Sequence, residues 1–138
     1  MTIQPCADIS LLARLYLELA EDEASDTRRT PDEAEEGLRE ALRSGDAAYA
    51  FIAEGSVVGY ALVAPVRKPP YLRHFYICRN ARREGYGTEA FHALLRTLGA
   101  NTLDLDVFVW NERGKAFWAS LGFAPRATIM RYNANAHD

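Results

Sequence analysis

The stretch that decides the fold is Tyr71-Leu72-Arg73-His74-Phe75-Tyr76-Ile77-Cys78, followed by Arg79-Asn80-Ala81-Arg82-Arg83-Glu84-Gly85-Tyr86-Gly87-Thr88. Its first half is rich in aromatic and β-branched residues, which favours a strand with both faces partly covered. Its second half carries two glycines and runs into apolar residues at three- and four-residue steps, which predict a helix ended by Gly99. A central strand therefore enters a glycine-containing turn and then a helix, which is the layout of a phosphate site.

Two helices and a hairpin are predicted before this stretch. Leucines at helical spacing, a capping box with proline at the first helical position, and a later change to period-two alternation are the signals. The predicted elements are a helix over 8–21 capped by Asp8, a helix from Thr30 to about Ser44, and strands over 48–53 and 57–66 joined by Glu54-Gly55-Ser56.

Three elements are predicted after it: a strand over 103–109, a helix capped by Asn111 and ended by Gly122, and a final strand over 126–132. The predicted fold class is mixed α/β in the order α-α-β-β-β-α-β-α-β. Helices are expected on both faces of a mixed, mostly antiparallel sheet. Residues 1–138 are predicted to form one domain.

Composition is that of an ordinary globular protein, with 49% hydrophobic residues, 25% charged residues and a net charge of -3. Neither disorder nor a nucleic-acid partner is indicated. Cys6 and Cys78 lack CxxC spacing, so we expect reduced thiols and no metal. Without an apolar run of membrane length or an export signal, we expect a cytoplasmic protein with no membrane partner.

The turn has the chemistry of an anion receptor. Gly85 and Gly87 let the backbone present unpaired N–H groups at a helix start, and Arg79, Arg82 and Arg83 add charge-assisted donors for phosphate oxygens. Residues 85–90 also fit the dinucleotide pattern G-x-G-x-x-G/A. That alternative is weak, because a dinucleotide fold places the motif after its first strand.

At this point the chain resembles the GNAT superfamily of N-acetyltransferases over nearly its whole length. Arg82-x-x-Gly85-x-Gly87, after the strand residues Phe75-Tyr76-Ile77, is similar to the family's [QR]-x-x-G-x-[GA] pyrophosphate loop. The run Asn111-Glu112-Arg113-Gly114-Lys115-Ala116-Phe117-Trp118-Ala119-Ser120-Leu121-Gly122-Phe123 resembles the family's late N-x-x-A-x-x-F-Y-x-x-x-G-F helix.

The resemblance implies acetyl-CoA as cosubstrate. Its pyrophosphate would be held mainly by backbone in the loop, and its pantetheine arm would be contacted by two strand residues and an asparagine. The thioester would lie where strands near 71–78 and 103–109 splay apart, with an N–H near Ile77 or Cys78 polarising its carbonyl. The implied cofactor-binding residues are Phe75, Ile77, Arg82, Arg83, Glu84, Gly85, Tyr86, Gly87, Thr88 and Asn111.

Two residues are candidates for the general base that deprotonates the amine: Asp106, at a position where similar proteins carry an acidic base, and His74, whose ordinary pKa is near 6.5. Trp118 stands where many relatives have a tyrosine that protonates the departing thiolate, and an indole cannot do this. Cys78 suggests an acyl-enzyme, but the family resemblance implies direct transfer.

The expected function is therefore N-acetyl transfer from acetyl-CoA to an amine of a small molecule or protein. The alternative is a CoA-binding regulatory or interaction module, which Trp118 favours. The N-terminal residues 1–48 carry a net charge of -7, which attracts a cationic amine or simply faces solvent. A homodimer through paired edge strands is left open.

Overall fold

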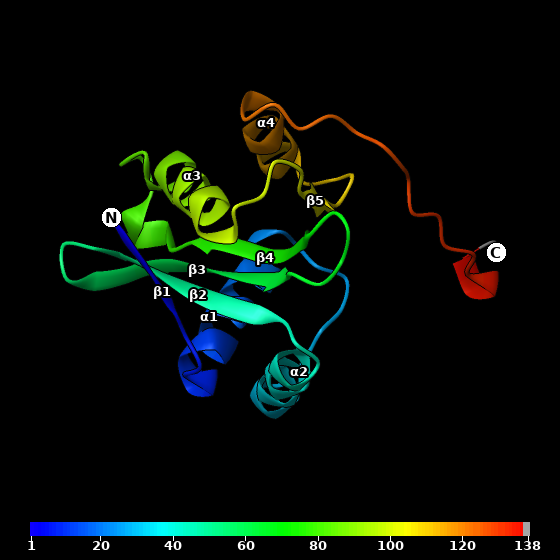
Figure 1. The fold of residues 1–138 in the computed structure, drawn as a ribbon. Coiled ribbons are helices and arrows are strands. Elements are labelled where there is room, and N and C mark those ends of the chain that lie inside the picture. The colour runs from blue at the N-terminus through cyan, green and yellow to red at the C-terminus, as the bar shows by residue number, and fades with distance from the viewer. Residues whose placement is uncertain (137–138) are drawn as a thin grey trace.

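The amphipathic and alternating patterns of the chain fold into a sheet with helices on both faces, as a computed structural model shows for residues 1–136 (Figure 1). The strands lie in the order β1-β2-β3-β4-β5 and are antiparallel except for the parallel pair β4 and β5. Their bounds are Thr2–Pro5 (β1), Ala47–Ala53 (β2), Ser56–Ala64 (β3), Tyr71–Ile77 (β4) and Asp104–Leu105 (β5).

Two helices cover each face of the sheet: α1 and α2 lie on one side, and α3 and α4 on the other (Figure 1). They span Ile9–Asp22 (α1), Pro31–Arg43 (α2), Tyr86–Leu98 (α3) and Glu112–Ser120 (α4), and short 3-10 turns occur at Arg79–Ala81 and Ala134–Ala136. The mixed α/β class with helices on both faces is thus confirmed. None of the helices within residues 1–136 is long and apolar enough to cross a membrane.

The element order differs from the sequence prediction at both ends. Residues Thr2–Pro5 add an unpredicted strand, which pairs antiparallel with β2. A run this short, with one large apolar residue and a proline, carries no periodicity of its own, so only the free edge of β2 makes it a strand.

The predicted strand over 126–132 was wrong. This segment has no strand pairing and leaves the body of the protein in extended form (Figure 1). Its apolar residues Ile129 and Met130 are 76% and 89% exposed. A strand needs a partner edge, and no neighbouring strand lies beside these residues.

The predicted strand over 103–109 is reduced to β5, two residues long. It pairs with β4 only at Tyr71 with Asp104 and Leu72 with Leu105. Beyond these pairs β4 continues for five residues while the other chain leaves the sheet. The divergence of the two strands leaves one edge of β4 without a strand beside it.

The core has two parts, one on each face of the sheet. Phe51, Phe91 and Leu94 are buried between the sheet and α3, whereas Leu12 and Tyr60 are buried between the sheet and α1. Side chains of β4 alternate between these parts: Phe75 and Ile77 face α3 and α4, and His74 and Tyr76 face α1. The central strand therefore offers a different set of side chains to each face.

Candidate active site

The turn between β4 and α3 differs from the other helix starts of this protein. Helices α1, α2 and α4 are each capped by a side chain, from Asp8, Thr30 and Asn111 respectively. Helix α3 has Gly85 as its N-cap, in the left-handed conformation (φ 75°), and receives no side-chain cap. The first intrahelical bond at this end is donated by Glu89. The N–H groups of the three residues before it, 86–88, thus lack a helical acceptor and carry the positive end of the helix dipole.

The predicted loop residues lie together around this helix start. Arg83, Glu84, Gly85 and Thr88 are exposed, whereas Tyr86 and Gly87 are half-buried. A Cβ atom on Gly87 would lie 3.2 Å from two ring carbons of Phe117, so the glycine allows α4 to pack closely against the loop. The ring of Phe117 in turn lies 6.0 Å from that of Phe75 on β4.

Backbone N–H groups of β4 point toward the divergence from β5. The Cys78 N–H donates to the Val58 carbonyl at 2.8 Å. Because bonding alternates along an antiparallel ladder, the N–H groups of Phe75 and Ile77 point away from β3. Since β5 ends at Leu105, no strand beside them accepts these donors. Of the two N–H groups expected from the sequence to polarise the thioester carbonyl, that of Cys78 is used in the sheet and that of Ile77 points away from β3.

The Arg82 guanidinium is engaged by protein groups. It donates to both carboxylate oxygens of Asp22, at 3.1 and 2.8 Å, and to the Ile77 carbonyl at 3.1 Å. Arg79 also contacts Asp22, at 3.4 Å. The sequence predicted that Arg79 and Arg82 donate to phosphate oxygens, whereas in the structure both donate to Asp22. Arg83 alone of the three has no ion pair with a carboxylate of residues 1–136.

Asp22 organises this corner of the protein. Burial raises the pKa of its carboxyl, but hydrogen bonds and charge from Arg82, helped by Arg113 and Arg79, outweigh burial and leave the pKa lowered. The Asp22 side chain is 17% exposed and that of Arg82 is 23% exposed. The bidentate pair therefore joins the end of α1 to the end of β4 in a partly desolvated place.

We expect Asp22→Asn to lower the free energy of unfolding by about 2 kcal/mol, because Arg82 would keep a half-buried charge without its partner. Glu36→Gln removes the same charge from exposed pairs with Arg39 and Arg43 and should cost less than about 1 kcal/mol. Urea unfolding measures both. Equal losses in the two variants would show that the Asp22 pair is an ordinary surface contact.

The end of α1 also contacts the chain that leaves β5. The Trp110 indole N–H donates to the Glu23 carbonyl at 3.1 Å, and the Trp110 ring stacks on Phe108 at 4.6 Å. Asp22 holds the β4 side through Arg82, and Glu23 holds the β5 side through Trp110. The last turn of α1 therefore bridges the two strands where they part.

Glu23 is a candidate that sequence reasoning did not select. Its carboxyl is half-buried, and burial, with a smaller effect from the neighbouring Asp22 charge, raises its pKa to about 7. The Glu23 charge is also one of the causes that raise the pKa of the Tyr60 phenol, which is fully buried. No local sequence signal marks Glu23, because it stands in an acidic run and its pKa depends on what packs over it.

The two predicted bases lie in different places. Asp106 is exposed and is hydrogen-bonded to Tyr71 at the start of β4. Six residues separate Tyr71 from Ile77, which is about 20 Å along a strand. His74 faces α1, with its ring 5.0 Å from that of Tyr16 and 5.9 Å from that of Tyr60. Burial, with the charges of Arg29 and Arg73, lowers the pKa of His74 to about 4.

Trp118 is part of the aromatic packing between α3, α4 and β4. Its ring lies 5.2 Å from that of Phe75, 5.9 Å from that of Phe91 and 5.2 Å from that of Phe123. Nearby, the Asn111 side chain accepts from the Gly114 N–H at 3.0 Å and so caps α4. Both residues thus have structural roles, and Asn111 keeps only its side-chain N–H groups for another contact.

Two further groups bear on the chemistry. Cys78 is half-buried, and burial, with the nearby charge of Glu18, raises the pKa of its thiol. A raised pKa leaves less thiolate, which disfavours an acyl-enzyme. Within residues 1–136, no group of three or more His, Cys, Asp or Glu side chains is arranged to hold a metal ion.

Comparison with known proteins identifies the family. Residues 12–123 match the acetyltransferase (GNAT) family. The chain therefore belongs to the GNAT acetyltransferases, and this membership supports acyl transfer as its general activity. A comparison with curated proteins found no match.

Solved structures with the same fold are distant in sequence. A possible acetyltransferase from Clostridium difficile is 17% identical with a TM-score of 0.75, over 96% of this chain and 97% of that one. The aminoglycoside antibiotic 6'-N-acetyltransferase from Acinetobacter haemolyticus is 17% identical with a TM-score of 0.69, at the same coverage. The ribosomal-protein-alanine N-acetyltransferase from Brucella melitensis biovar Abortus is 15% identical with a TM-score of 0.67, over 95% and 99%. The TM-scores show a shared fold. Because the identities are so low, they do not indicate which acceptor this protein uses.

Proposed function

We propose that this protein transfers an acetyl group directly from acetyl-CoA to a primary amine. The observation that carries the proposal is the uncapped start of α3 at the end of β4, beside strand N–H groups that have no neighbouring strand. The other three described α-helices satisfy their first N–H groups with a side chain. An open helix start of this kind, preceded by the unpaired Arg83, suits a pyrophosphate.

The rest of acetyl-CoA would follow the open edge of β4. The pyrophosphate would accept bonds from the N–H groups of 86–88, and the pantetheine amides would bond to Phe75 and Ile77. Asn111, through its side-chain N–H groups, would contact the same arm from the start of α4. The acetyl thioester would then lie where β4 and β5 part, close to the last turn of α1.

The chemistry needs an electrophile, a base and a leaving group. One of the β4 N–H groups that point away from β3 would stabilise the negative charge that develops on the thioester oxygen. A base removes a proton from the amine, whose nitrogen then bonds to the carbonyl carbon, and the carbon–sulfur bond breaks. Because a thiol has a pKa near 8.5, the thiolate leaves readily and takes up a proton from the protonated base or from water. Trp118 takes no part in this transfer.

Glu23 fits the role of base better than the two residues predicted from sequence. Its backbone carbonyl contacts Trp110 on the chain that leaves β5, and the pKa of its carboxyl is about 7, near the value that suits proton transfer at neutral pH. His74 is neutral at pH 7 but is a weak base with a pKa of about 4. Asp106 directly follows the end of β5, but it is exposed and hydrogen-bonded to Tyr71. Asp106 and His74 are the alternative bases, and the rates of Glu23→Gln, Asp106→Asn and His74→Gln distinguish the three residues.

A second function is a CoA-binding regulatory or interaction module, favoured by the packing of Trp118 where relatives carry a phenol. The test is release of CoA thiol from acetyl-CoA, followed colorimetrically with and without a panel of primary amines. We expect thiol release that requires an amine, with formation of the acetylated amine seen by mass spectrometry. Binding of acetyl-CoA without thiol release over the whole panel would favour the regulatory module instead.

A further inference from the structure

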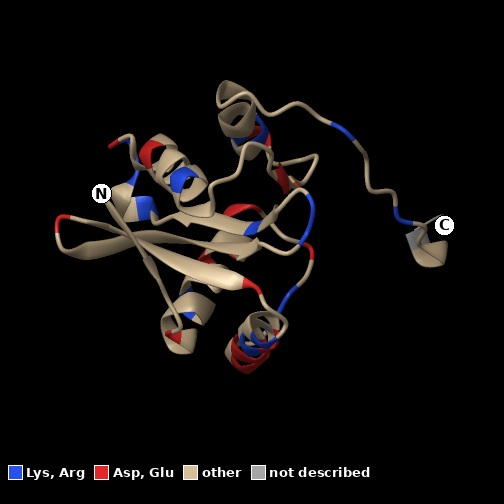
Figure 2. Ribbon diagram, in the orientation of Figure 1, with Lys and Arg blue, Asp and Glu red and all other residues tan. Residues whose placement is uncertain are grey.

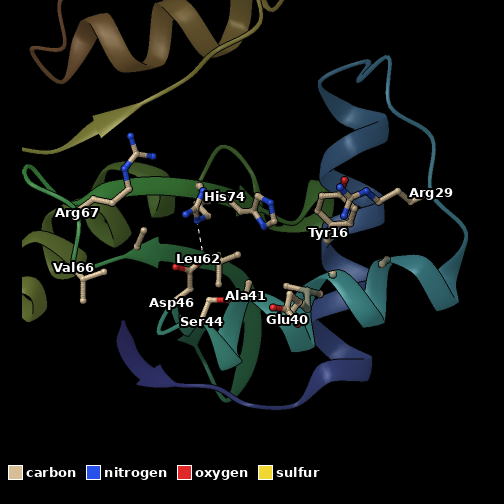
Figure 3. A pocket seen from close by; sticks show the side chains of 15 residues that line it. Tyr16, Arg29, Glu40, Ala41, Ser44, Asp46, Leu62, Val66, Arg67 and His74 are labelled. Atoms are coloured by element: carbon tan, nitrogen blue, oxygen red, sulfur yellow. Dashed lines mark hydrogen bonds and ion pairs between the residues drawn. The ribbon is translucent and has the colours of Figure 1, made fainter.

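A groove runs along α2 over β3 and β4, on the face of the sheet that carries α1 and α2 (Figure 3). Its volume is about 390 Å³, within the range of small-molecule sites. Tyr16, Arg29 and His74 line one part of it, and Val66 and Arg67 line another. Because His74 precedes Phe75 on β4, the groove adjoins the strand that would bind the thioester.

The charged groups in the groove leave cations in excess. Its two carboxylates are already paired: Asp46 accepts from Arg73 at 2.7 Å, and Glu40 accepts from Arg43 at 2.6 Å. Arg29 and Arg67 have no ion pair with a carboxylate of residues 1–136. The groove therefore presents two unpaired guanidinium groups (Figure 3).

Both unpaired guanidinium groups lie over tyrosine rings. The Arg67 guanidinium lies 4.3 Å from the centre of the Tyr71 ring, and that of Arg29 lies 5.8 Å from the centre of the Tyr16 ring. Stacking holds a guanidinium in place while its N–H donors stay free at the edge. Each of the two stacked guanidinium groups can therefore donate hydrogen bonds to an anion.

A glycine in the middle of α2 makes room for one of them. A Cβ atom on Gly37 would lie 2.7 Å from a terminal nitrogen of Arg29. Glycine inside a helix is unfavourable relative to alanine, and its space here is filled by the Arg29 side chain. The glycine at position 37 is therefore explained by the space that Arg29 needs in the groove, and not by the conformation of the helix.

His74, which lines the groove, has an unsatisfied polar atom beneath the groove surface. Its Nδ1 is buried and has no hydrogen-bond partner in the described structure. Buried polar atoms nearly always have a partner, and the buried Tyr60 hydroxyl, whose ring lies 5.9 Å from that of His74, also lacks one. The lowered pKa of His74 keeps the ring neutral, and one ring nitrogen can then accept a hydrogen bond.

From these contacts we infer that the groove binds the acceptor, and that the acceptor carries an anionic group, a carboxylate or a phosphate, in addition to its amine. This inference rests on the proposed acetyl transfer. The anionic group would lie at Arg29, because Arg67 lies at the other end of the groove (Figure 3), and the amine would reach the thioester past His74.

The acidic helices do not offer a competing site for a cationic amine. Their carboxylates are largely paired within the helices: Glu35 with Arg39, Glu36 and Glu40 with Arg43, and Glu18 with Arg14. Figure 2 shows both acidic and basic residues on α2.

The inference is tested by kinetics with acetyl-CoA and three acceptors of similar length: 4-aminobutanoate, 3-aminopropyl phosphate and 1,4-diaminobutane. We expect kcat/KM at least tenfold higher for an anionic acceptor than for the diamine. Preference for the carboxylate or for the phosphate identifies the anion. A higher kcat/KM for 1,4-diaminobutane would overturn the inference.

Variants locate the preference. Arg29→Gln should lower kcat/KM for the preferred anionic acceptor about tenfold, Arg67→Gln should lower it less, and both should leave the diamine nearly unchanged. Arg28→Gln and Lys68→Gln remove the same charge one residue away, outside the groove lining, and should change neither. Equal effects in groove variants and controls would mean that only overall charge matters, and would overturn the inference.

Gly37→Ala separates binding from folding. It should raise the melting temperature through helix propensity, yet lower kcat/KM for the anionic acceptor as Arg29→Gln does.

If turnover is undetectable, calorimetric titration of the two anionic acceptors into the CoA-bound protein decides: no binding of either overturns the inference. A melting-temperature shift with acetyl-CoA, measured in parallel, shows whether the proposed function has failed instead.

Discussion

Replacing Gly85 by aspartate is expected to abolish the rise in melting temperature that acetyl-CoA gives the unchanged protein. At a concentration of one hundred times its dissociation constant, a ligand that binds only the folded state adds about 2.7 kcal/mol to stability. Gly85 has φ 75° and no atom within 4 Å of its missing Cβ, so the carboxylate would enter the space where we place the pyrophosphate. Repulsion between the two anions removes binding.

Gly55 offers a matched control for this variant. It has φ 77°, also with nothing within 4 Å of its missing Cβ, but it lies in the turn between β2 and β3. Gly55→Asp therefore brings the same backbone strain and the same charge without touching the loop. Differential scanning fluorimetry of the three proteins with and without acetyl-CoA makes the comparison. A retained shift in Gly85→Asp, or a shift lost in both variants, contradicts the proposed loop.

Glu23→Gln is expected to lower kcat by a hundredfold or more, because general base catalysis typically contributes about 10²–10⁴. With the pKa of Glu23 raised to about 7, kcat/KM of the unchanged enzyme should rise with pH through about 7. The variant should lose this dependence. Glu21→Gln removes the same charge two residues earlier on the exposed side of α1 and is the control.

The same carboxyl makes a prediction about stability. Its pKa is raised on folding from its ordinary 4.5 to about 7, so folding favours the protonated form. Its contribution is therefore fully present below pH 4.5 and is lost as pH rises toward 7. Glu23→Gln should melt at a higher temperature than the unchanged protein at pH 8, with little difference at pH 4.

Asp106→Asn and His74→Gln, assayed for kcat in parallel with Glu23→Gln, would identify either alternative base if Glu23→Gln keeps its rate and pH profile.

The sequence by itself determined the local parts of this protein. Each predicted helix formed within a residue or two of its expected ends, because caps such as Thr30 and Asn111 and the glycine after α3 act on neighbouring backbone. The glycine loop after β4 could be predicted for the same reason, since positive φ and free N–H groups depend on a few consecutive residues. The resemblance to GNAT proteins rests on these local motifs.

Long-range contacts decided the rest. Thr2–Pro5 became a strand because β2 has a free edge, while 126–132 found no edge to join. The partner of Arg82 is Asp22, sixty residues away. Arg82, which was expected to bind phosphate, therefore links the end of α1 to the end of β4.

The candidate base and acceptor groove likewise exist only in three dimensions. Glu23 acquires its raised pKa from the groups packed over the end of α1, and the groove gathers arginines from a loop before α2 and a loop after β3. Capping and turn geometry act over a few residues, and the sequence states them directly. Burial and charge act between side chains that meet only when the sheet and helices are packed, so tertiary structure alone decides them.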